Sequence, residues 1–151
     1  MYKKILLPTD GSESAVKAAK HALWIACKDG ADIIVLNVFE IYTPSIAFPI
    51  STLAGSTEDI YEPLKKEAEK ISDELVDALK SSEDYKSCNV NIKRMVRQGS
   101  PYNEILKTVD EMGIDLVVMG SSGRHGFDRF VLGSETERVV RKSEVPVLVV
   151  P

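Results

Sequence analysis

Short apolar runs alternate along the chain with longer stretches in which apolar residues recur every three or four positions. The short, β-rich runs are residues 4–7, 33–39, 90–96, 115–119 and 145–150. A stretch with helical spacing follows each of the first four runs, and the predicted helices lie at residues 14–28, 57–79, 100–112 and 135–142. The pattern therefore predicts five strands and four helices in strict alternation.

Strict alternation of strands and helices predicts an α/β fold with a parallel sheet and helices on both of its faces. The run 33–39 is apolar at successive positions, as expected for a strand that is covered on both sides. In the run 90–96, Met95 breaks the alternation, so we expect this strand to be half-exposed. The last run contains Pro146, which cannot donate a hydrogen bond within a sheet, so we expect this strand at a sheet edge.

The ends of the predicted helices carry residues that favour starting or stopping a helix. Ser12 or Ser14 can cap the first helix, and Gly30 can end it in a left-handed conformation. Ser100 can cap the third helix, whose first turn contains Pro101. The expected buried face of the second helix consists of Ile60, Leu64, Ala68, Ile71, Leu75 and Leu79.

Length and composition fit one globular domain that spans residues 1–151, with 44% hydrophobic and 28% charged residues. The formal net charge of −4 argues against non-specific binding to nucleic acid or to anionic membranes. No apolar stretch approaches the roughly 20 residues of a membrane span. The first apolar run is also too short for the core of a secretory signal, so we expect a cytoplasmic location.

The two cysteines, Cys27 and Cys88, stand far apart and lack the paired spacing of a metal or redox motif. We interpret both as small apolar packing residues. Isolated cysteines are typical of a reducing compartment, which agrees with the expected cytoplasmic location.

A glycine-rich segment, residues 120–134, joins the fourth predicted strand to the fourth predicted helix. A strand, a glycine-rich turn and a helix N-terminus together present backbone N–H groups to a phosphate. The segment has neither the lysine of the common phosphate-binding loop nor the position of a dinucleotide turn. It carries Arg124, His125 and Arg129, which either suit a polyphosphate or lie in solvent. The segment therefore indicates nucleotide binding, with a flexible surface loop as the alternative.

A second turn, residues 8–11, follows the first predicted strand. In open parallel sheets, ligands bind beyond the carboxyl ends of the strands where the winding reverses, so we expect this turn to face the glycine-rich segment. Asp10 can accept a ribose hydroxyl or lie near a phosphate-bound Mg²⁺. Equally, Asp10 can simply close an Asp-Gly turn by bonding its own backbone.

Gly120, Gly123, Gly133 and Ser134 follow the spacing G-x2-G-x9-G-[ST]. This spacing is the C-terminal signature of the universal stress protein family, which the chain resembles. The likeness extends to residues 3–12, 98–101, 115–121 and 145–150. It covers nearly the whole chain, although residues 40–58 are not diagnostic.

The resemblance implies a three-layer, Rossmann-like fold of the adenine nucleotide α-hydrolase type, with five parallel strands in the order 3-2-1-4-5. It also implies ATP as the ligand, because members with this signature form the ATP-binding branch, with Mg²⁺ or Mn²⁺ bound through the phosphates. Members of the family commonly form homodimers through the last strand, which agrees with the edge position expected here.

Carried over by position, the resemblance predicts the nucleotide-binding residues. The residues around adenosine and ribose would be Pro8, Thr9, Asp10 and, through its backbone, Val38. The residues that wrap the ribose and phosphates would be Met119, Gly120, Ser121, Ser122, Gly123, Arg124, His125 and Gly126. The residues that hold the distal phosphates at the helix N-terminus would be Gly133, Ser134 and Glu135.

Glu135 departs from the family pattern, which usually has a small or apolar residue at this position. A carboxylate in the first turn stabilises a helix by roughly 0.3–1 kcal/mol, but it would repel a phosphate if it pointed inward. Ser134 and Glu137 also match a capping box, in which each side chain bonds the other residue's backbone. We expect Glu135 to face outward and ATP still to bind, though less tightly.

The sequence contains no recognisable catalytic apparatus. His21 lies on a predicted helix and His125 in the glycine-rich segment, and neither has a partner at a fixed spacing. We expect a nucleotide-dependent switch or sensor that binds an unknown protein partner, and not an enzyme. The alternatives are a stress-related interaction protein without a nucleotide requirement and a slow ATPase. The apolar residues 42–53 are either a partner surface or a loop packed on its own domain.

Overall fold

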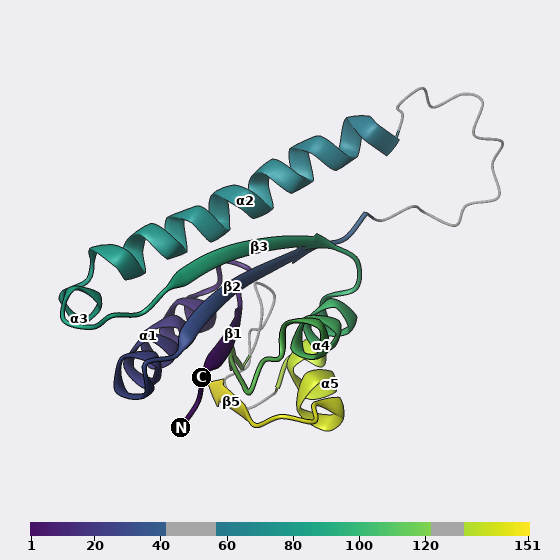
Figure 1. Ribbon diagram of the computed structural model, residues 1–151. Helices are drawn as coiled ribbons and strands as arrows, with labels where there is room; N and C mark the ends of the chain where they lie inside the picture. Colours follow the sequence, from purple (N-terminus) through teal and green to yellow (C-terminus); the bar gives the residue numbers. More distant parts are fainter. Residues whose placement is uncertain (42–56, 122–131) are drawn as a thin grey trace, which may run out of the picture.

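The computed structural model describes residues 1–41, 57–121 and 132–151 (Figure 1). Its elements are β1 (Lys4–Pro8), α1 (Glu13–Asp29), β2 (Asp32–Phe39), α2 (Thr57–Ser81), α3 (Glu83–Lys86), β3 (Ile92–Gln98), α4 (Pro101–Met112), β4 (Leu116–Gly120), α5 (Ser134–Lys142) and β5 (Val147–Val150). All predicted strands and helices are present in these ranges. The short helix α3 is not predicted by the apolar pattern, and Ser82 caps it by accepting a hydrogen bond from Tyr85 N at 3.2 Å.

The strands form one parallel sheet in the order β3-β2-β1-β4-β5, which confirms the predicted fold class and strand order. The edge position predicted for the last strand is also confirmed, since β5 pairs only with β4 among the described strands. Pro146 immediately precedes β5, and its carbonyl accepts a hydrogen bond from Val117 N at 3.0 Å. β3 forms the other edge and is half-exposed, as predicted, although it begins at Ile92 and not at residue 90.

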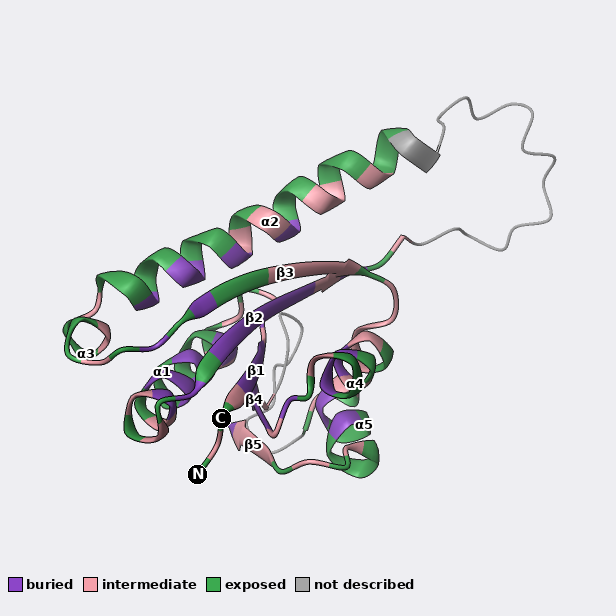
Figure 2. Cartoon of the chain, viewed as in Figure 1, coloured by how far each residue is buried: buried purple, intermediate pink, exposed green. Residues whose placement is uncertain are grey.

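Two hydrophobic clusters lie on opposite faces of the sheet, between it and the helices (Figures 1 and 2). The first cluster joins the alanine-rich face of α1 and the later turns of α2 to the sheet. The second joins α4 and α5 to the sheet through residues such as Ile105, Val109 and Val139. The buried face predicted for α2 is wrong at its start, because Ile60 is 50% exposed. Its buried residues begin at Ala68, where α2 lies against β2 and β3.

The ends of α1 agree with the sequence. Ser12 is the cap, since its Oγ accepts a hydrogen bond from Ala15 N at 3.3 Å. Gly30 ends the helix with φ = 70°, in the left-handed region that favours glycine. The start of α1 is thereby held at the end of β1, where the first turn was expected to contribute to a ligand site.

The two cysteines form a disulfide, so the expectation that Cys27 and Cys88 are isolated is wrong, although both pack against a hydrophobic cluster as expected. The bond joins α1 to the segment after α3, with a Cα–Cα distance of 5.3 Å across a sequence separation of 61. No local motif reveals such a pair, because only the packing of α1 beside α3 brings the two residues together. The argument from isolated cysteines to a reducing compartment therefore no longer applies. The cytoplasmic location stays a prediction, and within the described ranges no helix is both long and apolar enough to cross a bilayer.

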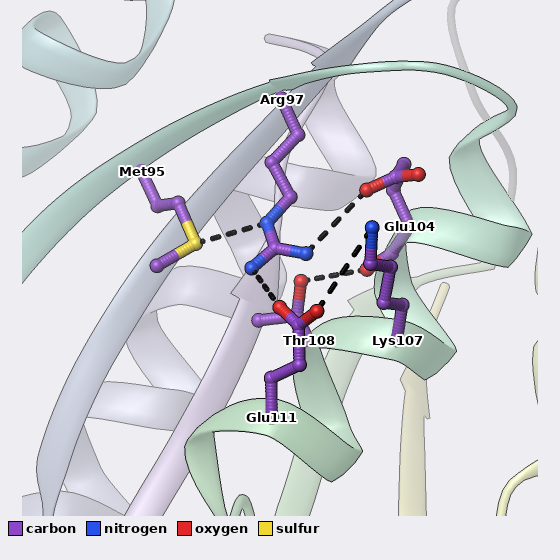
Figure 3. A network of polar contacts seen from close by, with 6 residues as sticks. All are labelled: Met95, Arg97, Glu104, Lys107, Thr108 and Glu111. Carbon is purple, nitrogen blue, oxygen red and sulfur yellow. Dashed lines mark hydrogen bonds and ion pairs between the residues drawn. The ribbon is translucent and has the colours of Figure 1, made fainter.

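An ionic network fastens α4 to the end of β3 (Figure 3). The Arg97 side chain, 18% exposed, lies 2.5 Å from Glu111 Oε2 and 3.4 Å from Glu104 Oε2. The hydrogen bond from Arg97 lowers the pKa of Glu111 below its ordinary value of 4.5, and the same bond raises the pKa of Arg97. Lys107 is a weaker partner of the same carboxylate, with its Nζ 3.9 Å from Glu111 Oε1.

We predict that Arg97→Met lowers stability at neutral pH and that this loss shrinks in acid. A carboxylate with a depressed pKa in the folded state stabilises the fold above its unfolded pKa, and this contribution disappears as the pH falls through the folded pKa. Urea unfolding at neutral pH and at about pH 3 measures the effect, with Lys107→Met as the control on the same carboxylate. If Arg97→Met lowers the free energy of unfolding by the same amount at both pH values, the ion pair contributes nothing to stability.

Candidate functional site

A pocket of about 530 Å³ opens at the carboxyl ends of β1, β2 and β4. The turn after β1 and the beginning of α1 form one wall, and α4 and the first turn of α5 form the opposite wall. The lining residues are Pro8, Thr9, Asp10, Ser12, Ala15, Leu36, Val38, Glu40, Pro101, Ile105, Met119, Gly120, Gly133, Ser134, Glu135 and Thr136. The pocket thus lies at the carboxyl ends of the strands, at the point where the winding reverses, as the topology predicted.

Hydrogen bonds to β2 and within the turn hold the turn after β1. Thr9 N donates to Leu36 O at 2.8 Å, which continues the pairing with β2. The Asp10 carboxylate accepts a hydrogen bond from Ser12 N at 2.9 Å, and Gly11 has φ = 78°. Asp10 therefore closes an Asp-Gly turn, as the structural alternative predicted, while it also lines the pocket.

The two ends of the glycine-rich segment meet beside the pocket. Gly133 N donates to Ser121 O at 2.8 Å, and Thr136 Oγ1 donates to Gly120 O at 3.0 Å. A Cβ added to Gly120 would lie 2.4 Å from Ser14 Oγ and 2.9 Å from the backbone N of Ala15, so a side chain cannot fit without a shift of α1. Glycine at this position allows β4 to approach the start of α1 closely.

The first turn of α5 differs from the prediction. Gly133 is the N-cap and makes no side-chain hydrogen bond, and helix α5 begins at Ser134. The predicted capping box of Ser134 and Glu137 is therefore wrong. Because the first N–H groups of a helix have no partner within it, the beginning of α5 gives the pocket a wall with donor character.

Glu135 does not face outward, so this expectation is also wrong. Its side chain is half-buried and lines the pocket, and its Oε2 accepts a hydrogen bond from Tyr102 N at 2.8 Å. Ser100, the predicted cap of α4, makes no side-chain cap bond, so the carboxylate of the neighbouring helix caps α4 in its place. Arg138 lies 3.5 Å from the other carboxylate oxygen and 5.0 Å from the centre of the Tyr102 ring.

The pocket combines an apolar side with several acidic groups. Leu36, Val38 and Ile105 form an apolar surface suited to a flat ring. The carboxylates in the lining are Asp10, Glu40 and Glu135, and the described lining residues include no lysine, arginine or histidine. Among the described residues, no group of three or more histidine, cysteine or acidic side chains is arranged to hold a metal ion.

Most of the predicted site residues come together in this pocket. Those in the lining are Pro8, Thr9, Asp10, Val38, Met119, Gly120, Gly133, Ser134 and Glu135. Ser121 lies beside it through its bond to Gly133, whereas Ser122, Gly123, Arg124, His125 and Gly126 lie outside the described residues. The apolar residues 42–53, considered as a partner surface, also lie outside them.

Sequence reasoning missed the contribution of α4 to the pocket. Pro101 and Ile105 belong to the helix that follows β3, and this helix also begins at the carboxyl edge of the parallel sheet. That topology was a usable signal. The segment contains no glycine pattern or charge cluster, however, and so did not stand out as part of a site.

Comparison with known proteins agrees with the fold and with the family that the chain resembles. The model of the Universal stress protein family matches residues 1–151. Universal stress protein MJ0531 of Methanocaldococcus jannaschii is 38% identical over 150 residues, which cover 99% of this chain and 82% of the relative.

Two solved structures are also similar. The structure of MJ0577 has a TM-score of 0.74 at 32% identity, covering 99% of this chain and 96% of the other. A universal stress protein solved in complex with cAMP has a TM-score of 0.59 at 25% identity, with the same coverage of 99% and 96%. Because the family model spans the whole chain and the strand order agrees, this protein belongs to the universal stress protein family.

Proposed function

We propose that this protein binds an adenine nucleotide, ATP according to its glycine signature, in the pocket between the turn after β1 and the first turn of α5. The observation that carries the proposal is that the three described positions of the signature, Gly120, Gly133 and Ser134, line one pocket together with the turn after β1. The cAMP complex of a structural neighbour supports an adenine nucleotide as the class of ligand.

In this proposal, each part of the nucleotide meets matching chemistry. The adenine lies on the apolar side formed by Leu36, Val38 and Ile105, and the ribose lies near Asp10. The phosphates lie at the beginning of α5, where the first turn of the helix, from Ser134 on, presents backbone N–H groups. Mg²⁺ or Mn²⁺ would bind mainly through the phosphate oxygens, because the described residues offer no ready set of metal ligands.

We further propose that the nucleotide acts as a switch for binding a protein partner. α5 begins in the pocket and leads directly into the edge strand β5, so a ligand at its N-terminus touches the element that positions that edge. A ligand shifts such an equilibrium only as far as it binds the two states differently. The switch therefore requires that partner binding and nucleotide binding change each other's affinity by the same factor.

The edge strand β5 is the surface that we propose for homodimerisation. Val147, Leu148 and Val149 are only half-buried, and β5 has β4 as its sole described neighbour. An apolar strand edge of this kind can pair with a second copy of the chain. Sedimentation of the purified protein tests this proposal. A monomer at every protein concentration, both with and without nucleotide, would contradict it.

The test of nucleotide binding has two stages. The purified protein is denatured, and the released small molecules are identified by mass spectrometry. The emptied and refolded protein is then titrated with ATP and Mg²⁺ by calorimetry. We expect one nucleotide to bind per chain. If no nucleotide is released and no binding occurs at millimolar ATP, the proposal is wrong. The remaining function is then that of an interaction protein without a nucleotide requirement. Phosphate release with turnover would favour the slow ATPase.

A further inference from the structure

Glu135 is a carboxylate that the fold holds at the pocket wall. It lies in the first turn of α5, yet its Oε2 accepts the hydrogen bond from Tyr102 N in the first turn of α4, at 2.8 Å. Arg138 Nη1 lies 3.5 Å from its other oxygen. The bond to α4 and the ion pair within α5 hold this side chain, which is 37% exposed, at the pocket wall.

The charged side chains in the described part of the pocket lining are all acidic. Asp10 and Glu40 also line it, and the described lining contains no cationic side chain. Arg138, which pairs with Glu135, has a 55% exposed side chain and lies outside the described lining. Negative groups on low-dielectric walls focus a negative potential into a cleft, which opposes an anionic ligand in proportion to its charge.

We infer that Glu135 is a specificity-determining residue that makes the pocket discriminate between adenine nucleotides by the number of their phosphates. Its negative charge repels each additional phosphate at the beginning of α5. It therefore weakens the binding of ATP more than the binding of AMP and leaves the binding of adenosine unaffected. The inference rests on the proposed function, because it concerns the ligand of the same pocket.

The substitution Glu135→Gln isolates the charge from the structure. Glutamine has nearly the same shape, and its Oε1 can still accept the hydrogen bond from Tyr102 N, so α4 remains capped. The matched control is Glu137→Gln, which removes one negative charge from the same helix. Glu137 is exposed, pairs with Arg141 at 2.8 Å and does not line the pocket.

The experiment measures the dissociation constants of adenosine, AMP and ATP for the wild type and both variants, with a chelator present so that no divalent cation masks the charges. Glu135→Gln is expected to lower the dissociation constant of ATP roughly tenfold and that of AMP severalfold, and to leave that of adenosine unchanged. Effects of this size are expected for charges several ångströms apart in a partly screened site. Glu137→Gln is expected to leave all three constants within about twofold.

The outcomes separate this inference from the proposed function. If the wild type binds adenosine and AMP but Glu135→Gln leaves the ratio of ATP to AMP affinity unchanged, the phosphate discrimination is wrong and nucleotide binding stands. A ratio that changes equally in Glu137→Gln also overturns the inference, because it would show a long-range charge effect. If the wild type binds none of the three ligands, the proposed function and the inference fail together.

Discussion

Reduction of the Cys27–Cys88 disulfide is expected to lower the free energy of unfolding by about 4 kcal/mol, because the bond closes a loop with a sequence separation of 61. In the chain-entropy model, such a cross-link limits the conformations of the unfolded chain, and longer loops give larger effects. The loop contains β2, which is an interior strand of the sheet, and the helices α2 and α3. For a domain of this size, the melting temperature should fall by roughly 10 °C.

Denaturant unfolding with and without a reductant measures this effect, and mass spectrometry of alkylated protein verifies the redox state. The control is the double variant Cys27→Ser with Cys88→Ser, whose unfolding should not respond to the reductant. Nucleotide affinity should stay unchanged, because the disulfide lies at the end of α1 that contacts the amino end of β1, where Asp29 accepts a hydrogen bond from Tyr2 N at 2.6 Å. Identical unfolding of the oxidised and reduced wild type would contradict the prediction.

Gly133→Val is expected to weaken nucleotide binding by on the order of 10- to 100-fold, because each hydrogen bond to a charged group contributes about 1.5–3 kcal/mol. Gly133 has φ = −60° and ψ = 149°, which any residue can adopt, so the backbone does not require glycine. In our account, the pocket requires glycine at this position, because the branched methyl groups of valine would occupy the space in front of the first N–H groups of α5. The loss of a favourable N-cap residue should cost only about 1 kcal/mol of stability.

The control for this prediction is Gly113→Ala at the end of α4. Gly113 has φ = 62°, and nothing lies within 4 Å of the position of an added Cβ, so the substitution costs backbone strain alone. That strain is about 1 kcal/mol, similar to the cost at Gly133. We therefore expect two variants of similar stability, of which only Gly133→Val loses affinity by calorimetry. Equal affinities in both would show that the phosphates lie elsewhere.

The fold was predictable from the sequence because its signals are local. Each strand run is bounded by turn residues, and the alternation with helices permits only parallel pairing. Pro146 marked an edge because the missing N–H is a property of one residue. The features that were missed depend on tertiary packing. Cys27 and Cys88 pair only because α1 lies beside α3.

The candidate site was predictable to a similar extent, and for similar reasons. Gly120 and Gly133 carry a spacing that is visible along the chain, and the topology placed them opposite Asp10. The direction of Glu135 was not predictable, because it depends on an uncapped helix N-terminus that belongs to another part of the sequence. Local capping rules favoured Ser134 and Ser100 as caps. Because α5 packs against α4, the Glu135 carboxylate instead caps α4 by accepting the hydrogen bond from Tyr102 N.

The central claim is that an adenine nucleotide binds at the carboxyl ends of β1 and β4. A crystal structure of the protein grown with ATP and Mg²⁺ tests it most directly. Our account predicts the adenine against Val38 and the phosphates at Gly133 and Ser134. A nucleotide bound elsewhere, or an empty pocket at saturating ATP in a crystal that leaves the pocket open, would contradict it.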